Sequence, residues 1–247
     1  MRVNKKFNLA LISLLTVGFL ISGIASYYLL LNSARSEILS RAQILLDAAL
    51  AARNYTVKEV RPLLTERGKD EFLPQTVPAY GATQIFRDIN TKHPEYYYKE
   101  ATLNPTNPRD LAVEWEKEII DEFRASEEDT TKIGERQTLT GRSLYIARPI
   151  RIKKASCLVC HSTPEAAPKT MIELYGTKNG FNWQLNEVVG AQVVVVPLTE
   201  AVNSAQKTAF TFMGILLVIF VLIVIAANLI LRRKPGAAEA EPVQTAS

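Results

Sequence analysis

The sequence predicts an α+β fold, in which an antiparallel sheet with flanking helices follows a long N-terminal helix and lies between two transmembrane helices. Three observations predict it. Two apolar runs lie toward the ends of the 247-residue chain, helical periodicity follows the first run, and strand-like segments fill the second half. The region between the runs, residues 32–208, is long enough for one compact domain with its own core.

The two apolar runs are residues 7–31 and 209–231, and neither contains a charge. Each is long enough to cross a hydrocarbon core of about 30 Å as a helix. A cleaved signal peptide is the alternative for the first run, because Gly23-Ile24-Ala25 offers small residues at a cleavage spacing. The run is longer than the apolar region of a usual signal peptide, which favours an uncleaved anchor.

The charges beside the runs predict the orientation. The basic residues next to them are Arg2, Lys5, Lys6, Arg232, Arg233 and Lys234. The positive-inside rule therefore places residues 1–6 and the tail 232–247 in the cytoplasm and residues 32–208 outside. We expect a protein of the bacterial inner membrane with its main domain in the periplasm.

The overall charge is basic because of these flanks. The chain has 29 Lys and Arg against 25 Asp and Glu. Setting aside the six flanking cations, and Glu239 and Glu241 in the tail, leaves 23 residues of each sign. A nucleic-acid surface is therefore not indicated. The Ala/Glu/Pro-rich tail is predicted to be disordered and shows no kinase segment, so we expect that any signal reaches a partner protein or that the chain acts differently.

Residues 33–64 continue in a helical pattern. The apolar positions that recur near helical spacing are Ile38, Ala42, Leu45, Leu46, Ala49 and Val57. One interpretation is a connecting helix with one apolar face. The other is a signalling stalk that pairs with a second copy in a homodimer, and the stripe is too short to establish a coiled coil.

The pattern breaks at residues 66–68, and a short helix is expected at 82–90. Residues 103–108 are rich in turn-forming types and predict a loop. Residues 110–126 predict an amphipathic helix with Asp110 as its N-cap. Its apolar face consists of Leu111, Trp115, Ile119 and Phe123.

The second half predicts a sheet. Residues 136–140 and 143–152 alternate between polar and apolar types around Thr140-Gly141, which indicates a hairpin. Residues 188–197 contain four consecutive valines and predict a central buried strand. A helical segment, 198–208, leads from this strand into the second apolar run. This order of elements is typical of a PAS-like or Cache-like extracytoplasmic sensor, an analogy that does not establish function.

The segment Cys157-Leu158-Val159-Cys160-His161 carries the attachment signature of c-type haem. Two thiols at this spacing can add to the two vinyl groups of one porphyrin, and the following imidazole can bind the iron. A redox Cys pair would leave His161 without a role. A zinc site would need two further ligands, and His93 is the only other histidine. We expect one covalent haem c, attached outside the cytoplasm, where such attachment takes place.

Several segments, in this order along the chain, resemble a bacterial family of PAS-like c-type haem domains that often precede histidine kinase modules. They are Val77–Tyr80, Tyr98–Pro105, Ala147–Ile150, Cys157–Pro168, Tyr175-Gly176, Asn179–Phe181 and Gly190–Gln192. The resemblance covers most of residues 35–200. It implies a PAS-like fold with one c-type haem, attached through Cys157 and Cys160, and with His161 as the proximal iron ligand.

The sixth iron ligand remains open. A characterised haem site in the similar family resembles His/Cys ligation, with a thiolate from outside the attachment motif. Both cysteines of this chain are used for attachment, which excludes that ligation. The alternatives are Met171, His93, a weak ligand such as water, or none. An ordinary apolar role is the simpler interpretation of Met171, and an exposed loop position that of His93.

Two further groups have alternative interpretations. The cations Arg148, Arg151, Lys153 and Lys154 could neutralise haem propionates or form a solvated basic strand. The aromatic residues Tyr80, Tyr145, Phe181 and Trp183 could line a haem or pack in the core.

These observations favour a membrane-anchored c-type haem protein that senses redox state or a diatomic gas and signals through a partner. Strand 188–197 would pass the change to the second transmembrane helix. The alternative function is a membrane-anchored electron-transfer cytochrome. The sequence has no Ser/His/Asp arrangement and no phosphate-binding glycine loop, so we expect no enzyme, and a peroxidase is the least supported interpretation.

Overall fold

The computed structural model describes residues 2–64, 71–126, 128, 130–138 and 141–232. Contacts divide the chain into two units. Ala34–Val202 form one, called here the sheet unit. The described parts of Met1–Ser33 and Asn203–Ser247 form the other, the helical-pair unit. The predictions for residues 66–68, Thr140 and the tail beyond Arg232 lie outside the described residues.

The helical-pair unit contains the predicted membrane spans. They belong to α1 (Arg2–Tyr55) and α7 (Thr199–Arg232), which are long and apolar enough to cross a membrane. The most apolar stretch of each helix is entirely unburied, unlike a core helix of a soluble protein. Within this unit, Asn8 donates a hydrogen bond to the Asn228 side chain at 2.8 Å, and Gln206 donates one to the Tyr27 hydroxyl at 3.3 Å. The two spans therefore pair side by side in antiparallel directions.

The sheet unit is built on four antiparallel strands in the order β1-β4-β3-β2. They are β1 (Tyr97–Thr102), β2 (Lys132–Thr138), β3 (Gly141–Arg151) and β4 (Val188–Pro197). The α+β prediction is confirmed. As predicted, β4 is central, and it is buried at every position before its last residue. Its run of valines follows from this position, because both faces of the strand are covered.

The hairpin prediction is also confirmed, with longer strands than expected. β2 starts at Lys132, and β3 starts at Gly141, whose φ of +107° suits glycine. The strand β1 was missing from the prediction and is a correction to it, since residues 97–102 pair along β4.

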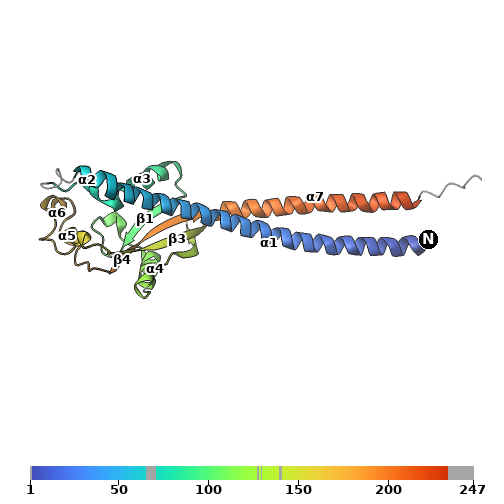
Figure 1. Ribbon diagram of the computed structural model, residues 1–247. Helices are drawn as coiled ribbons and strands as arrows, with labels where there is room; N and C mark the ends of the chain where they lie inside the picture. Colours follow the sequence, from blue (N-terminus) through green and yellow to red (C-terminus); the bar gives the residue numbers. More distant parts are fainter. Residues whose placement is uncertain (1, 65–70, 127, 129, 139–140, 233–247) are drawn as a thin grey trace, which may run out of the picture. The chain divides into compact units, whose positions relative to one another are not determined.

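The helix α1 and helix α3 (Pro78–Lys92) cover one face of the sheet (Figure 1). This core consists mainly of Ile38, Ala42, Leu46, Ala49, Phe86, Leu144, Ile146, Val194 and Val196. The apolar stripe of α1 is thus buried against the chain's own sheet, which agrees with the connecting-helix interpretation. A homodimer stays a prediction.

Helix α4 (Glu114–Arg124) covers the opposite face with Ile119, Ile120 and Phe123 (Figure 1). The predicted start of this helix at Asp110 is wrong. Residues Pro108–Asp110 form a separate 3₁₀ turn, and the α-helix begins after Val113. The Glu116 carboxylate accepts a hydrogen bond from the Val113 backbone at 2.9 Å, so it caps the helix in place of Asp110.

The remaining helices are short. α1 continues through a π-helical turn (Thr56–Val60) into α2 (Arg61–Leu64), so the helical prediction for 33–64 holds with one irregular turn. A 3₁₀ turn (Pro74–Thr76) precedes α3. A 3₁₀ turn (Ala155–Cys157), α5 (Leu158–His161) and α6 (Lys169–Tyr175) lie between β3 and β4, at one end of the sheet (Figure 1).

Candidate haem-attachment site

The Cys-x-x-Cys-His segment lies in an insertion between β3 and β4. Two backbone hydrogen bonds close its base, from Ile152 to Glu187 at 2.9 Å and from Asn186 to Ile152 at 2.8 Å. Cys157 ends the 3₁₀ turn, and Cys160 lies on the single turn of α5. Residues three apart on a helical turn share one face, so the local fold presents both thiols together. Both are free and half-buried.

His161 is oriented by its own hydrogen bonds. Its Nδ1 lies 2.8 Å from the backbone oxygen of Gly180 and 3.5 Å from the Thr106 hydroxyl. The carbonyl can only accept, so Nδ1 carries the proton and Nε2 keeps its lone pair. Burial lowers the pKa of His161, which favours the neutral imidazole that a metal requires.

The ring of Trp183 fixes the plane of this imidazole. The two rings stack at a centroid distance of 4.0 Å and an angle of 15°. Two backbone bonds hold the stacked segments together, from Trp183 to His161 at 3.1 Å and from Asn182 to Ser162 at 2.8 Å. The hydrogen bond to Gly180 and the stacking together leave the imidazole little freedom to rotate.

Asn104 braces the loop that carries the Gly180 carbonyl. Its side-chain oxygen accepts from the Gly180 backbone at 3.0 Å, and its amide donates to the Phe181 carbonyl at 3.1 Å. Gly180 has a φ of +88°, and a Cβ there would lie 2.8 Å from the Thr106 backbone. Only glycine fits this approach. Sequence reasoning identified these residues in loop or resemblance segments but not their contact with His161.

Cys160 faces apolar surroundings. It packs against a small cluster of Ala167, Met171 and Phe181. Burial raises the pKa of the Cys160 thiol, and the nearby Arg61 opposes that shift. A thiol in this setting is a protected group beside an apolar surface, and such a surface suits the edge of a porphyrin.

The two candidate sixth ligands lie in different places. Met171 is 2% exposed and packs beside Phe181, next to the loop that orients His161, so the apolar interpretation describes it. His93 is exposed and lies 3.6 Å from the Glu95 carboxylate. It precedes β1, which starts opposite Val195, near the end of β4 away from the insertion. The structure does not bring His93 to the motif.

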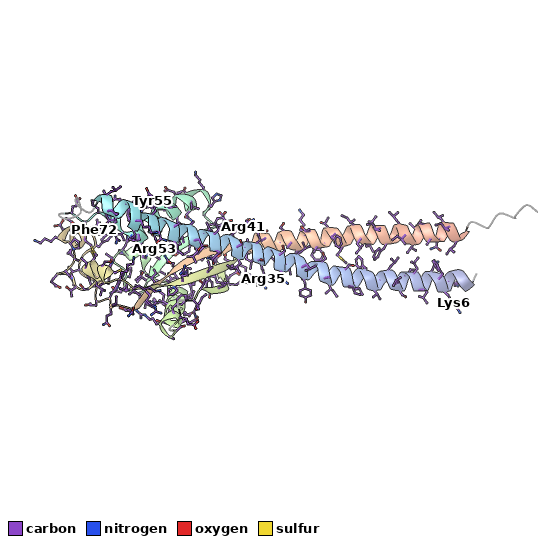
Figure 2. The ribbon with its side chains drawn as sticks, viewed as in Figure 1. Lys6, Arg35, Arg41, Arg53, Tyr55 and Phe72 are labelled. Carbon is purple, nitrogen blue, oxygen red and sulfur yellow. The ribbon has the colours of Figure 1, made fainter. Side chains whose placement is uncertain are left out.

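Beside the motif lies a hollow of about 210 Å³ that the sequence did not reveal. It is lined by Leu50 and Arg53 from α1, by Arg148, Pro149, Ile150 and Arg151 from β3, by Lys153, and by Gln192 from β4. Three of the four predicted cations therefore gather here, and Lys154 is not among the lining residues. Figure 2 labels Arg53 on the part of α1 that covers the sheet.

Arg53 connects the hollow to the motif and to the core. Its guanidinium forms an ion pair with Glu100, which also accepts from the Tyr98 hydroxyl at 2.8 Å. Burial disfavours the charged form of Arg53, but Glu100, Tyr98 and Cys157 outweigh it and raise the pKa. Arg53 therefore stays charged, and Cys157 lies within its electrostatic range.

The four predicted aromatic residues separate into two pairs. Phe181 and Trp183 lie at the site, as described above. Tyr145 packs against Trp115 at 5.6 Å on the α4 face, and the Arg109 guanidinium lies 5.9 Å from the Tyr80 ring. The second pair therefore belongs to the core and the surface.

The donor set fits a covalently attached haem. Two thiols three residues apart, a neutral imidazole with a free Nε2 and an apolar cluster are the groups that such a haem requires. A multi-ligand metal site has less support, because within the described ranges no three His, Cys, Asp or Glu side chains gather closely enough to hold an ion.

Comparison with known proteins agrees with this fold. The model of the Tll0287-like family matches residues 31–197. The crystal structure of the cyanobacterial haem protein Tll0287 is similar, with a TM-score of 0.51 at 15% identity, and the alignment covers 65% of this chain and 95% of that one. No curated protein sequence matches the chain.

Proposed function

The chain belongs to the Tll0287-like family, and from this membership and the geometry of the Cys157–His161 segment we propose that it is a membrane-anchored c-type haem protein. Each thiol would add its S–H across one vinyl group, which forms a C–S bond and moves the hydrogen to the vinyl carbon without an oxidant. The bound haem supplies reversible one-electron chemistry at its iron.

One observation carries the proposal. His161 commits Nδ1 to the Gly180 carbonyl and so keeps Nε2 for a metal, and it directly follows the second of two thiols three residues apart. Metal-binding histidines are typically oriented in this way, through the ring nitrogen that does not bind. A redox Cys pair would need neither the oriented imidazole nor its stacked tryptophan.

We further propose that the protein is a non-enzymatic sensor of redox state or of a diatomic gas, in the bacterial inner membrane with its sheet unit in the periplasm. Gln192 of β4 lines the hollow beside the motif, and β4 is followed directly by α7, which contains the second apolar run. A change at the haem would pass along this strand and reach a partner protein.

The test is the optical spectrum of the full chain, produced with a c-type haem attachment system. We expect a pyridine haemochrome typical of c-type haem, lost in Cys157→Ser/Cys160→Ser. His161→Ala should change the iron coordination, while the matched variant His93→Ala should leave the spectrum unchanged. A wild-type protein without haemochrome would overturn the proposal.

A second measurement separates sensing from electron transfer. A sensor should bind CO or NO rapidly in its ferrous form, or change its helix or dimer arrangement with oxidation state. A six-coordinate haem with fast electron exchange and no such change would favour the electron-transfer cytochrome instead.

A further inference from the structure

The hollow beside the motif concentrates positive charge. Of its lining residues, Arg53, Arg148, Arg151 and Lys153 are cationic, and none of the described residues that line it is acidic. Glu100 neutralises the charge of Arg53 through their ion pair. Like charges in a partly buried space repel one another and are normally compensated by an anion. The hollow therefore has the character of an anion site.

The type of cation indicates the type of anion. Three of the four are arginines, whose planar guanidinium matches a carboxylate through two parallel hydrogen bonds. Arg151 lines the hollow, but its guanidinium donates to the Asn186 carbonyl at 2.9 Å and to the Ser126 carbonyl beyond the end of α4 at 3.5 Å. Arg53 is held by its ion pair with Glu100. Such fixed donors lose little conformational freedom when an anion binds.

The hollow also lies within reach of a group attached at the motif. Lys153, which lines the hollow, precedes Cys157 by four residues, and Arg53 lies close enough to Cys157 for that group to contribute to its raised pKa. In a haem, the vinyl groups that form the thioether bonds occupy one edge, and the two propionate carboxylates occupy another. A haem fixed through Cys157 and Cys160 would thus carry two tethered carboxylates at high effective concentration.

We propose that this hollow is a carboxylate-binding site that receives the haem propionates, with Arg53, Arg148 and Lys153 as their partners. The inference rests on the proposed function, since it requires the haem. Through Arg53 and Glu100, the site links the propionate edge of the haem to α1 and to β1. The same chemistry could bind a free dicarboxylate, and the experiment distinguishes the two sources.

The test compares cations that line the hollow with a neighbour that does not. The variants are Arg148→Gln and Lys153→Gln, with Arg148→Lys as the charge-retaining change and the exposed Lys154→Gln as the matched control. All are made in the full chain, loaded with haem. The first readout is the equilibrium constant for iron reduction. The second is the coupling of an amine to the haem carboxylates by a carbodiimide, measured as a mass increase of the haem peptide.

Removing a cation near the haem disfavours the more negative reduced form. We expect each lining variant to lower the reduction constant by about threefold to tenfold, where tenfold is 59 mV for one electron. Amine coupling should rise severalfold because the carboxylates lose their partners. Lys154→Gln should stay close to the wild type in both readouts, while Arg148→Lys should keep the reduction constant, because the charge remains, and raise amine coupling less than Arg148→Gln does.

Two results would overturn the inference. One is an equal effect of Lys154→Gln and the lining variants, which would mean a general charge effect. The other is a shift in reduction without a gain in coupling, which would place the cations away from the carboxylates. Succinate should bind to the haem-less Cys157→Ser/Cys160→Ser chain and not to the haem-loaded wild type, and equal binding to both would also contradict the propionate source.

The haemochrome of the same wild-type sample separates this inference from the proposed function. If it is absent, the proposed function fails. If it is present and the lining variants match the control, only the propionate site fails.

Discussion

Two ion pairs lie on opposite faces of β1, and they differ in what surrounds them. On the α4 face, Lys99 pairs with Glu116 at 2.7 Å and donates to the Leu111 carbonyl at 2.7 Å. Glu116 is fully buried and also caps α4 through the Val113 backbone. Glu116 also accepts from the Tyr97 hydroxyl at 3.3 Å, so both charges are hydrogen-bonded within the protein and the pair is closed and structural.

On the α1 face, Arg53 pairs with Glu100, but its side chain is 25% exposed and lines the hollow. The carboxylate is satisfied by Arg53 and by Tyr98, whereas the guanidinium still faces a space with other cations. The two pairs share the same chemistry, and only the one that opens onto the hollow can respond to an added anion. Whether a charged group faces an open space is therefore a better indication of a binding role than whether the group is buried.

The largest expected effect comes from breaking the closed pair. Lys99→Met leaves the Glu116 carboxylate buried without its cation, which costs about 3–5 kcal/mol. The melting temperature of the full chain should fall by roughly 10 °C, measured by circular dichroism, while the reduction constant of the haem stays unchanged. Lys117→Met, which breaks the exposed pair with Glu114, should change stability by less than about 0.5 kcal/mol. Similar losses in the two variants would contradict the structural role of the closed pair.

The ion pairs also explain why β1 was missing from the sequence prediction. Its charged residues Lys99 and Glu100 are buried, because Glu116 and Arg53 reach them from helices on either side. A single sequence shows the charges but not the partners, which lie 17 and 47 residues away. The valine run of β4, by contrast, required no partner to be recognised.

The candidate haem site likewise contains residues that the sequence could predict and residues that it could not. The thiols and His161 could be predicted, because covalent attachment and iron binding fix their spacing within five consecutive residues. The groups that orient His161 could not be predicted, since Asn104 and Gly180 meet only after the 3₁₀ turns and loops fold. The hollow likewise depends on Arg53, which shows no pattern that separates it from the other charges of α1.

The second prediction concerns the ion pair between Arg53 and Glu100. Arg53→Gln leaves Glu100 with the Tyr98 hydroxyl, and because Arg53 is more exposed than Lys99, the expected loss in stability is smaller, about 1–3 kcal/mol. Unlike Lys99→Met, it should also lower the reduction constant, because Arg53 faces the hollow. The matched control is Arg41→Gln, which removes an exposed arginine of the same helix that pairs with Glu37 (Figure 2). A reduction constant insensitive to Arg53 would mean that both pairs are purely structural.

The smallest expected effect concerns the carboxyl group of Asp110, whose pKa is affected by Lys99 of one ion pair and by Glu100 of the other. Burial raises the pKa of Asp110 to about 6, Glu100 adds to the shift, and Arg109 and Lys99 oppose it. The folded protein therefore binds a proton at Asp110 more tightly than the unfolded chain, whose aspartate titrates near 4. The free energy of unfolding falls as pH rises from about 4 to 6, and the full penalty persists above pH 6.

Asp110→Asn removes this penalty. We expect the variant to be more stable than the wild type by about 1–2 kcal/mol at pH 8, with a gain that shrinks toward pH 4. The gain is below the full value of the shift because the variant also loses the ion pair with Arg109 at 3.4 Å. Thermal unfolding at several pH values measures it, with Asp121→Asn as an exposed carboxyl control on α4. A difference independent of pH would show that Asp110 ionises normally.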